Sequence, residues 1–144
     1  MNILKVLTPR RLLGNFGEKS ACKFLKKSGY KILERNFIAF NKEIDIIAKN
    51  KREDVTVFVE VKTRSSTYSN PNEPRPASAV TPKKQRDIIK AAKCYIAFQR
   101  LEGRVRFDVI EVIADAKGKK KKISYIKHLE NAFNYNSANK GVRK

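Results

Sequence analysis

Residues 55–64, with the sequence VTVFVEVKTR, constrain the fold of this chain more than any other segment. β-branched residues occupy alternate positions, and such residues favour the pleated surface of a β-strand. Side chains two apart in a strand point to the same side. One face of this predicted strand therefore carries Val55, Val57, Val59 and Val61, and the other face carries Phe58, Glu60 and Lys62.

The charged residues of this strand need an explanation, because removing a charge from water inside a fold is costly. Glu60 and Lys62 share a face with the apolar Phe58. A second predicted strand, residues 43–49, places Glu43 and Asp45 among isoleucines. We interpret the charged groups of both strands as binding something charged, such as a divalent cation and a phosphate.

Hydrophobic spacing and turn residues divide the rest of the chain. Residues 15–28 are predicted to form an amphipathic helix that ends near Gly29. Residues 82–99 are predicted to form a second helix, with Thr81 as its N-cap. The other predicted strands are residues 30–40, 104–113 and 123–126. Loops are expected at residues 50–54, 65–80 and 118–122.

These elements follow the order helix, three strands, helix, strand, strand. Strands joined by short turns pair antiparallel, whereas a strand reached through a crossover helix can pair in parallel. The predicted fold is therefore an α/β fold in which a mixed β-sheet is flanked by helices.

Charge restricts the class of partner. The chain has 144 residues, enough for one domain, and a formal net charge of +19. A polyanion is the natural partner of such a chain, and nucleic acid is the commonest one. No segment approaches the ~18 apolar residues that span a bilayer, and the interrupted apolar run in residues 1–13 is too short for a signal-peptide core. We expect a cytoplasmic protein that binds nucleic acid and no membrane.

The chemistry that fits these residues is phosphodiester hydrolysis. Mg²⁺, or Mn²⁺ in its place, takes oxygen ligands and needs only one or two carboxylates beside its waters. Asp45 and Glu60 lie on neighbouring predicted strands, and the carbonyl of Val61 is a further oxygen. Lys62 can orient or deprotonate the water or stabilise charge on the phosphate. Glu18, in the first turn of its predicted helix, can approach as an additional acid.

Five short motifs together resemble a known family. They are Gly14-x-x-Gly17-Glu18, Gly29-Tyr30 with Asn36, Glu43-Ile44-Asp45, residues 58–64 (FVEVKTR) and Arg106-Phe107-Asp108. The combination strongly resembles the YraN-like family of bacterial proteins, which are predicted nucleases of the restriction-endonuclease-like superfamily, related to archaeal Holliday-junction resolvases. The resemblance implies a restriction-endonuclease-like fold with an αβββαβ core and metal-dependent cleavage of DNA, with branched DNA as one option.

The superfamily's site, an acid followed by (D/E)xK, corresponds to Asp45, Glu60 and Lys62, and the helix-borne acid of the resolvases corresponds to Glu18. The resemblance runs from about residue 14 to residue 133. It leaves residues 1–13 as an N-terminal extension and 134–144 as a basic tail. Lys42 stands where this family usually has glycine, which alters the turn before Glu43.

Several charged residues have more than one interpretation. Glu43 is either a member of the site or a surface charge. Asp108 is expected to pair with an arginine, and the lone histidine, His128, is expected to be structural. The nucleic-acid contacts are expected from Arg64, Lys83, Lys84 and Arg86, although a lysine-rich helix can also be a solvated face.

The functional hypothesis is a metal-dependent endonuclease that contacts DNA through its phosphates, on branched or damaged DNA as one option. The alternative is a protein of the same scaffold without turnover, which binds nucleic acid or docks on a repair complex. Composition does not separate the two, since both need a basic surface. A homodimer, as in the resolvases, is left open because no self-complementary patch is visible in the sequence.

Overall fold

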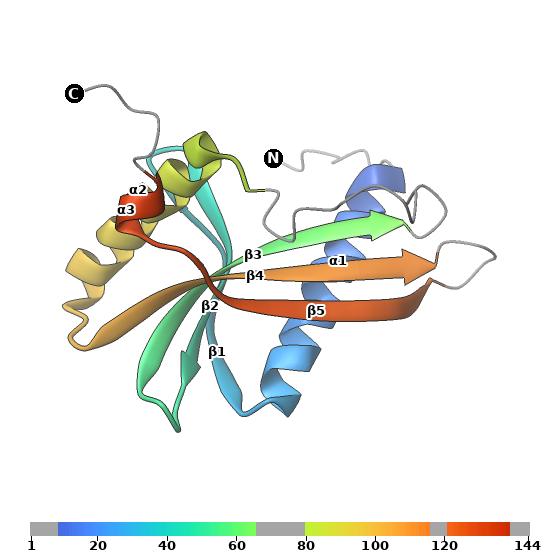
Figure 1. The fold of residues 1–144 in the computed structure, drawn as a ribbon, viewed down its shortest axis with the longest axis horizontal. Helices are drawn as coiled ribbons and strands as arrows, with labels where there is room; N and C mark the ends of the chain where they lie inside the picture. The colour runs from blue at the N-terminus through green and yellow to red at the C-terminus, as the bar shows by residue number, and fades with distance from the viewer. Residues whose placement is uncertain (1–8, 66–79, 116–120, 139–144) are drawn as a thin grey trace, which may run out of the picture.

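A five-stranded mixed sheet, with strand order β1-β2-β3-β4-β5, forms the centre of the computed structural model (Figure 1). The structure describes residues 9–65, 80–115 and 121–138. The strands are β1 (Tyr30–Ala39), β2 (Lys42–Asn50), β3 (Val55–Ser65), β4 (Arg104–Asp115) and β5 (Lys122–Phe133). The helices are α1 (Pro9–Lys27), α2 (Pro82–Gln99) and the short α3 (Tyr135–Ala138).

The pairing of the strands follows their connections. β1, β2 and β3 are joined by tight turns and pair antiparallel. The connection from β3 to β4 includes α2, and these two strands pair in parallel. β5 then returns antiparallel to β4. The predicted α/β fold with a mixed sheet and flanking helices is therefore confirmed.

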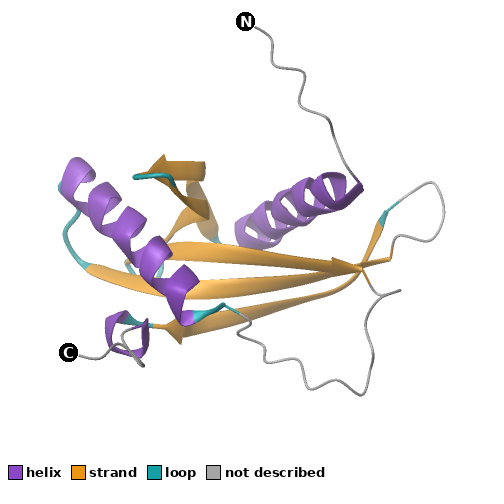
Figure 2. Ribbon diagram, turned by 90° about the horizontal axis from the view of Figure 1, so that it is seen from above, coloured by secondary structure: helices purple, strands orange, loops and turns teal. Residues whose placement is uncertain are grey.

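Two hydrophobic clusters cover the two faces of the sheet, and the alternation of β3 separates them. Phe58 packs with Ile88 and other residues of α2. Val57 and Val59 pack with Leu25 and other residues of α1. Figure 2 shows the two helices at different positions over the strands. The strand face that carries Phe58 is thus the face that continues to Glu60.

Both predicted helix ends are present in the structure. The side chain of Thr81 accepts a hydrogen bond from the backbone N–H of Lys84 at 3.1 Å, which caps the first turn of α2. Gly29, just beyond α1, has a φ of +90°, a conformation that glycine adopts without steric cost. α2 has the bounds that its sequence predicts. Among the described residues, none of the helices combines the length and apolarity that crossing a membrane requires.

Two sequence-based element bounds were wrong. α1 begins at Pro9 instead of near residue 15, so Glu18 lies in the middle of the helix and not in its first turn. β5 continues to Phe133 instead of ending near residue 126. β5 is an edge strand with most of its side chains exposed, so its sequence lacks the apolar alternation by which strands are recognised. Most of the expected loops at 65–80 and 118–122 lie outside the described residues.

A buried polar network fastens β4 to β5. Asp108 is fully buried and accepts hydrogen bonds from the Arg106 guanidinium at 2.8 and 2.9 Å. It also lies 2.7 Å from Nε2 of His128 and accepts from the N–H of Asn131 at 2.9 Å, where the register of the two strands shifts. Burial alone would raise the pKa of Asp108, but these partners lower it below its usual value. The predicted arginine partner of Asp108 and structural role of His128 agree with this network.

The sheet divides between β2 and β3. Their ladder begins at Asn50↔Val55 and ends at Ile46↔Val59, whereas β3 stays paired with β4 up to Ser65. Figure 1 shows β3, β4 and β5 running together while β1 and β2 turn across them toward α2. We call this opening, where β2 leaves β3, the fork.

Candidate active site at the fork

Asp45 is the first residue of β2 beyond the end of the ladder. Ile44 packs in the cluster under α2 and Ile46 in the cluster under α1, although residues two apart in a regular strand share a face. The alternation of β2 therefore changes phase at Asp45. Its carboxylate oxygen Oδ2 accepts a hydrogen bond of 2.8 Å from the backbone N–H of Val61, so a side chain replaces the missing ladder bond. This bond holds the carboxylate inside the fork.

Glu60 reaches the fork from β3. Its side chain is almost completely buried, and its oxygen Oε2 has no hydrogen-bond partner among the described residues. Burial, followed by the negative charge of Asp45, raises the pKa of Glu60 from 4.5 to about 8. The charges of Lys84 and Lys62 act in the opposite direction. Near neutral pH the protonated carboxyl of Glu60 can therefore donate to Asp45.

Lys62 lies beside Glu60, as the alternation of β3 predicts. Its amine nitrogen Nζ is 3.7 Å from Oε1 of Glu60, and its side chain is one-third exposed. The amine can therefore reach both the buried carboxylate and a molecule that approaches from solvent.

Glu18 approaches the fork from α1, and a close helix–strand contact places it there. A Cβ atom added to Gly17 would lie 1.7 Å from Oγ1 of Thr63, so only glycine permits this approach of α1 to β3. Burial and the charge of Asp45 raise the pKa of Glu18 from 4.5 to about 7, and the neighbouring charge of Glu43 adds to the effect. Glu18, Asp45 and Glu60 form one group of interacting carboxyls.

Comparison with known proteins places the chain in a family. Residues 17–112 match the uncharacterised protein family UPF0102. The chain belongs to this family. A UPF0102 protein of Clostridium acetobutylicum is 50% identical over 123 residues, which cover 83% of this chain and 92% of the relative. A UPF0102 protein of Chlorobium phaeobacteroides is 44% identical over 123 residues, covering 84% and 93%.

Among solved structures, this UPF0102 protein is similar to SfsA of Pyrococcus furiosus, a structure in complex with Ca²⁺. The sequence identity is 12%, and the similarity covers 81% of this chain and 63% of SfsA. The TM-score of 0.31 is too low to support an inference.

Two further residues of the UPF0102 chain belong to the margin of the site. The Asn36 side chain, with its amide oriented to donate to both neighbours, lies 3.0 Å from Oε2 of Glu18 and 3.0 Å from Oε1 of Glu43. Asn36 has a φ of +53° and lies between residues that pair with Ile44 and Ile46, so it stands opposite Asp45. Sequence reasoning gave no role to Asn36, since only its place in the motif singled it out. Glu43 is exposed but belongs to the group through this amide.

The basic residues expected to contact nucleic acid lie on two elements. Arg64 is half-buried on β3, two residues beyond Lys62. Lys83, Lys84 and Arg86 lie in the first turns of α2, where Lys83 is exposed and the other two are half-buried. The charge of Lys84 partly offsets the rise in the pKa of Glu60, so the beginning of α2 adjoins the fork. The fork is therefore bordered by carboxylates on one side and by cationic side chains on another.

The donor set of the fork fits a hard divalent cation. Asp45 and Glu60 offer carboxylate oxygens, one of them without a partner, and the crowding of their charges is what a cation relieves. No group of three or more His, Cys, Asp or Glu side chains arranged as metal ligands occurs in the described residues. Mg²⁺ does not require one, because it keeps several of its waters and needs one or two carboxylates.

Proposed function

We propose that this protein is a metal-dependent endonuclease that hydrolyses DNA phosphodiester bonds, with a restriction-endonuclease-like architecture. One observation carries the proposal: three carboxyls from three elements converge at the fork with the amine of Lys62 beside them. An ion pair on a strand is common, but buried carboxyls that raise one another's pKa are costly and are typical of functional sites.

Asp45 and Glu60 are the proposed ligands of Mg²⁺ or Mn²⁺, with the carbonyl of Val61 as a third oxygen. The hydrogen bond from Val61 to Asp45 orients the first carboxylate, and burial orients the second. When bound, such an ion neutralises charge on a phosphate and lowers the pKa of a coordinated water.

Lys62 and Glu18 complete the proposed catalytic group. The amine of Lys62 stabilises negative charge on the reacting phosphate and orients the attacking water, and its partial exposure leaves it accessible to substrate. Glu18, with a pKa of about 7, can give up or take on a proton at neutral pH. Asn36 holds the Glu18 carboxyl in place.

Substrate binding follows from charge. The net charge of +19 favours phosphate contacts with little base recognition, and Arg64, Lys83, Lys84 and Arg86 are the proposed contacts nearest the fork. Affinity should therefore fall steeply as salt concentration rises.

The test is a cleavage panel with single-stranded, duplex, flap and four-way DNA in Mg²⁺ and in Mn²⁺. Asp45→Asn and Lys62→Met should reduce nicking by at least about a hundredfold, since each removes a charge that acts on the transition state. The matched controls are Asp54→Asn and Lys49→Met, whose wild-type side chains form an ion pair of 2.8 Å. Asp54 already has a positive φ that asparagine tolerates. Both controls should nick like the wild type.

Binding measured in the same panel separates the proposal from its alternative. A protein that binds DNA with a steep salt dependence, and shows no cleavage with either metal, is a binding module on the same scaffold. Nicking that survives both Asp45→Asn and Lys62→Met would reject the assignment of the site.

A further inference from the structure

The tip of the β1–β2 hairpin holds an unusual aromatic residue. Ala39 pairs with Lys42, so Phe40 and Asn41 alone form the turn. Their φ values are +52° and +59°. A two-residue turn with both φ values positive is of type I′, in which asparagine and glycine are favoured. Asn41 fits this turn, but Phe40 does not, because a bulky residue is rarely found with a positive φ.

Packing does not explain Phe40. Its side chain is 67% exposed, and Ile38, two residues earlier, is 65% exposed. Neither belongs to the two hydrophobic clusters. A strained backbone position with an exposed aromatic side chain is a reason to look for a function.

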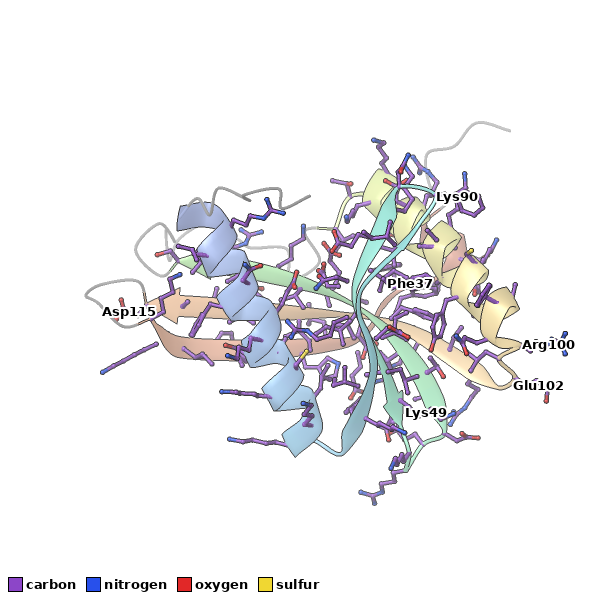
Figure 3. All side chains as sticks on the ribbon, turned by 180° about the vertical axis from the view of Figure 1, so that it is seen from behind. Phe37, Lys49, Lys90, Arg100, Glu102 and Asp115 are labelled. Atoms are coloured by element: carbon purple, nitrogen blue, oxygen red, sulfur yellow. The ribbon has the colours of Figure 1, made fainter. Side chains whose placement is uncertain are left out.

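A lysine amine and an ion pair lie beside the tip. The amine of Lys90 lies 5.4 Å from the centre of the Phe40 ring, and Figure 3 shows Lys90 on α2 beside the hairpin. Lys42 fastens the hairpin to α2 through an ion pair with Asp87 at 3.4 Å. The tip therefore lies against the same helix that carries Lys83 and Lys84. An aromatic ring beside the amine of Lys90 is complementary to a stacked base and its phosphate.

The same hairpin carries the candidate site. Asp45 follows Phe40 by five residues, through the turn and the start of β2. At ~3.4 Å per strand residue the two lie at most about 17 Å apart, which is about five base pairs of duplex. DNA with a phosphate at the fork can therefore reach the tip without bending the protein.

We infer that the hairpin tip is a stacking platform for an unpaired base, so that the protein prefers DNA whose duplex is interrupted near the cleaved phosphate. This inference rests on the proposed function, and it names the substrate class of that site. A base in continuous duplex has no free face to offer Phe40, whereas a base at a fork, flap or junction has one. Stacking on aromatic side chains tolerates any base, so the preference is for structure and not for sequence.

The test compares the affinity of the protein for two DNAs of equal length, a splayed fork and a continuous duplex. Fluorescence anisotropy in EDTA measures binding without cleavage. Phe40→Asn suits the type I′ turn and removes the ring. Stacking on an aromatic side chain is worth about 1–3 kcal/mol per base. We therefore expect the ratio of fork affinity to duplex affinity to be about tenfold lower for the variant than for the wild type.

The matched control is Phe98→Asn, at the far end of α2, where the wild-type ring is 86% exposed. It should keep the wild-type ratio. Thermal melting of both variants shows that they are folded, and Phe40→Asn should melt no lower than the wild type because it relieves the turn.

Two results would overturn the inference: a wild type that binds fork and duplex equally, or a Phe40→Asn variant that keeps the full ratio. Their meaning does not depend on catalysis, since binding is measured in EDTA. A wild type that prefers forks but nicks nothing with Mg²⁺ or Mn²⁺ would reject the proposed nuclease and support the platform. Absence of any DNA binding would reject both.

Discussion

Glu60 should destabilise the metal-free protein at alkaline pH, and Glu60→Gln should remove that effect. The pKa of Glu60 is raised from 4.5 to about 8, first by burial and then by the charge of Asp45. Each pKa unit corresponds to ~1.36 kcal/mol, so ionising this carboxyl in the folded protein costs on the order of 5 kcal/mol more than in the unfolded chain. That is a large part of the ~5–15 kcal/mol by which domains are usually stable.

The sign follows from proton binding. Between pH 4.5 and 8 the folded state holds a proton on Glu60 that the unfolded state has released. The unfolded state therefore binds fewer protons, and stability falls as pH rises. The stability that this proton contributes to the folded state is fully present below pH 4.5 and is lost once pH exceeds about 8. Glutamine keeps the shape of the protonated side chain and never ionises.

Urea unfolding in EDTA at pH 5 and pH 9 measures the effect. We expect Glu60→Gln to match the stability of the wild type at pH 5 within about 1 kcal/mol and to exceed it at pH 9 by about 3–5 kcal/mol. Glu102→Gln, at an exposed position outside the fork, is the control and should show no such change with pH. A difference between Glu60→Gln and wild type that is the same at both pH values would refute the reasoning.

A bound divalent metal should act in the opposite direction, by stabilising the wild type more than Glu60→Gln. A divalent cation that binds Asp45 and Glu60 favours the ionised carboxylates, so Mn²⁺ should stabilise the wild type at pH 8. At a hundredfold excess over the Kd, the gain is about 2.7 kcal/mol. Glu60→Gln lacks one ligand and should gain much less. An equal gain in both proteins would place the ion elsewhere.

The sequence revealed the elements in which local pattern and burial agree. β3 alternates between two covered faces, and α2 has a capping threonine, an N-terminal proline and a continuous apolar stripe. Their bounds were predicted to within one residue. The predicted β5 ended too early because an edge strand with a polar outer face has no such pattern. Its last residues are held by the hydrogen bond from Asn131 to Asp108, which is a tertiary contact.

The site shows the same division. The alternation of side chains along β3 was enough to predict that Lys62 lies beside Glu60. The expected pairing of neighbouring strands predicted that Asp45 lies near both. The phase change of β2 at Asp45 was not visible in the sequence, because it results from the departure of β2 from the ladder. The role of Asn36 was hidden for a related reason: it depends on a carboxyl from α1, and no spacing rule connects Glu18 with residue 36.

Two further predictions concern how the fork and the sheet are held. Gly17→Ala forces Cβ into Thr63 and should destabilise the protein by about 1–3 kcal/mol while weakening nicking through displaced Glu18. Gly14→Ala, on the same helix with open space around it, should stabilise by up to about 1 kcal/mol. If the two alanine variants unfold at the same urea concentration, the contact between α1 and β3 is looser than described. Asp108→Asn leaves Arg106, whose side chain is 12% exposed, without its buried counter-charge, and should cost about 3–5 kcal/mol at pH 7. Because the pKa of Asp108 is lowered, the stability it contributes is present above its unfolded pKa and disappears as pH falls through its folded pKa. The gap between Asp108→Asn and wild type in urea unfolding should therefore narrow in acid, and a gap that stays constant down to pH 3 would mean that packing, not charge, holds β4 to β5.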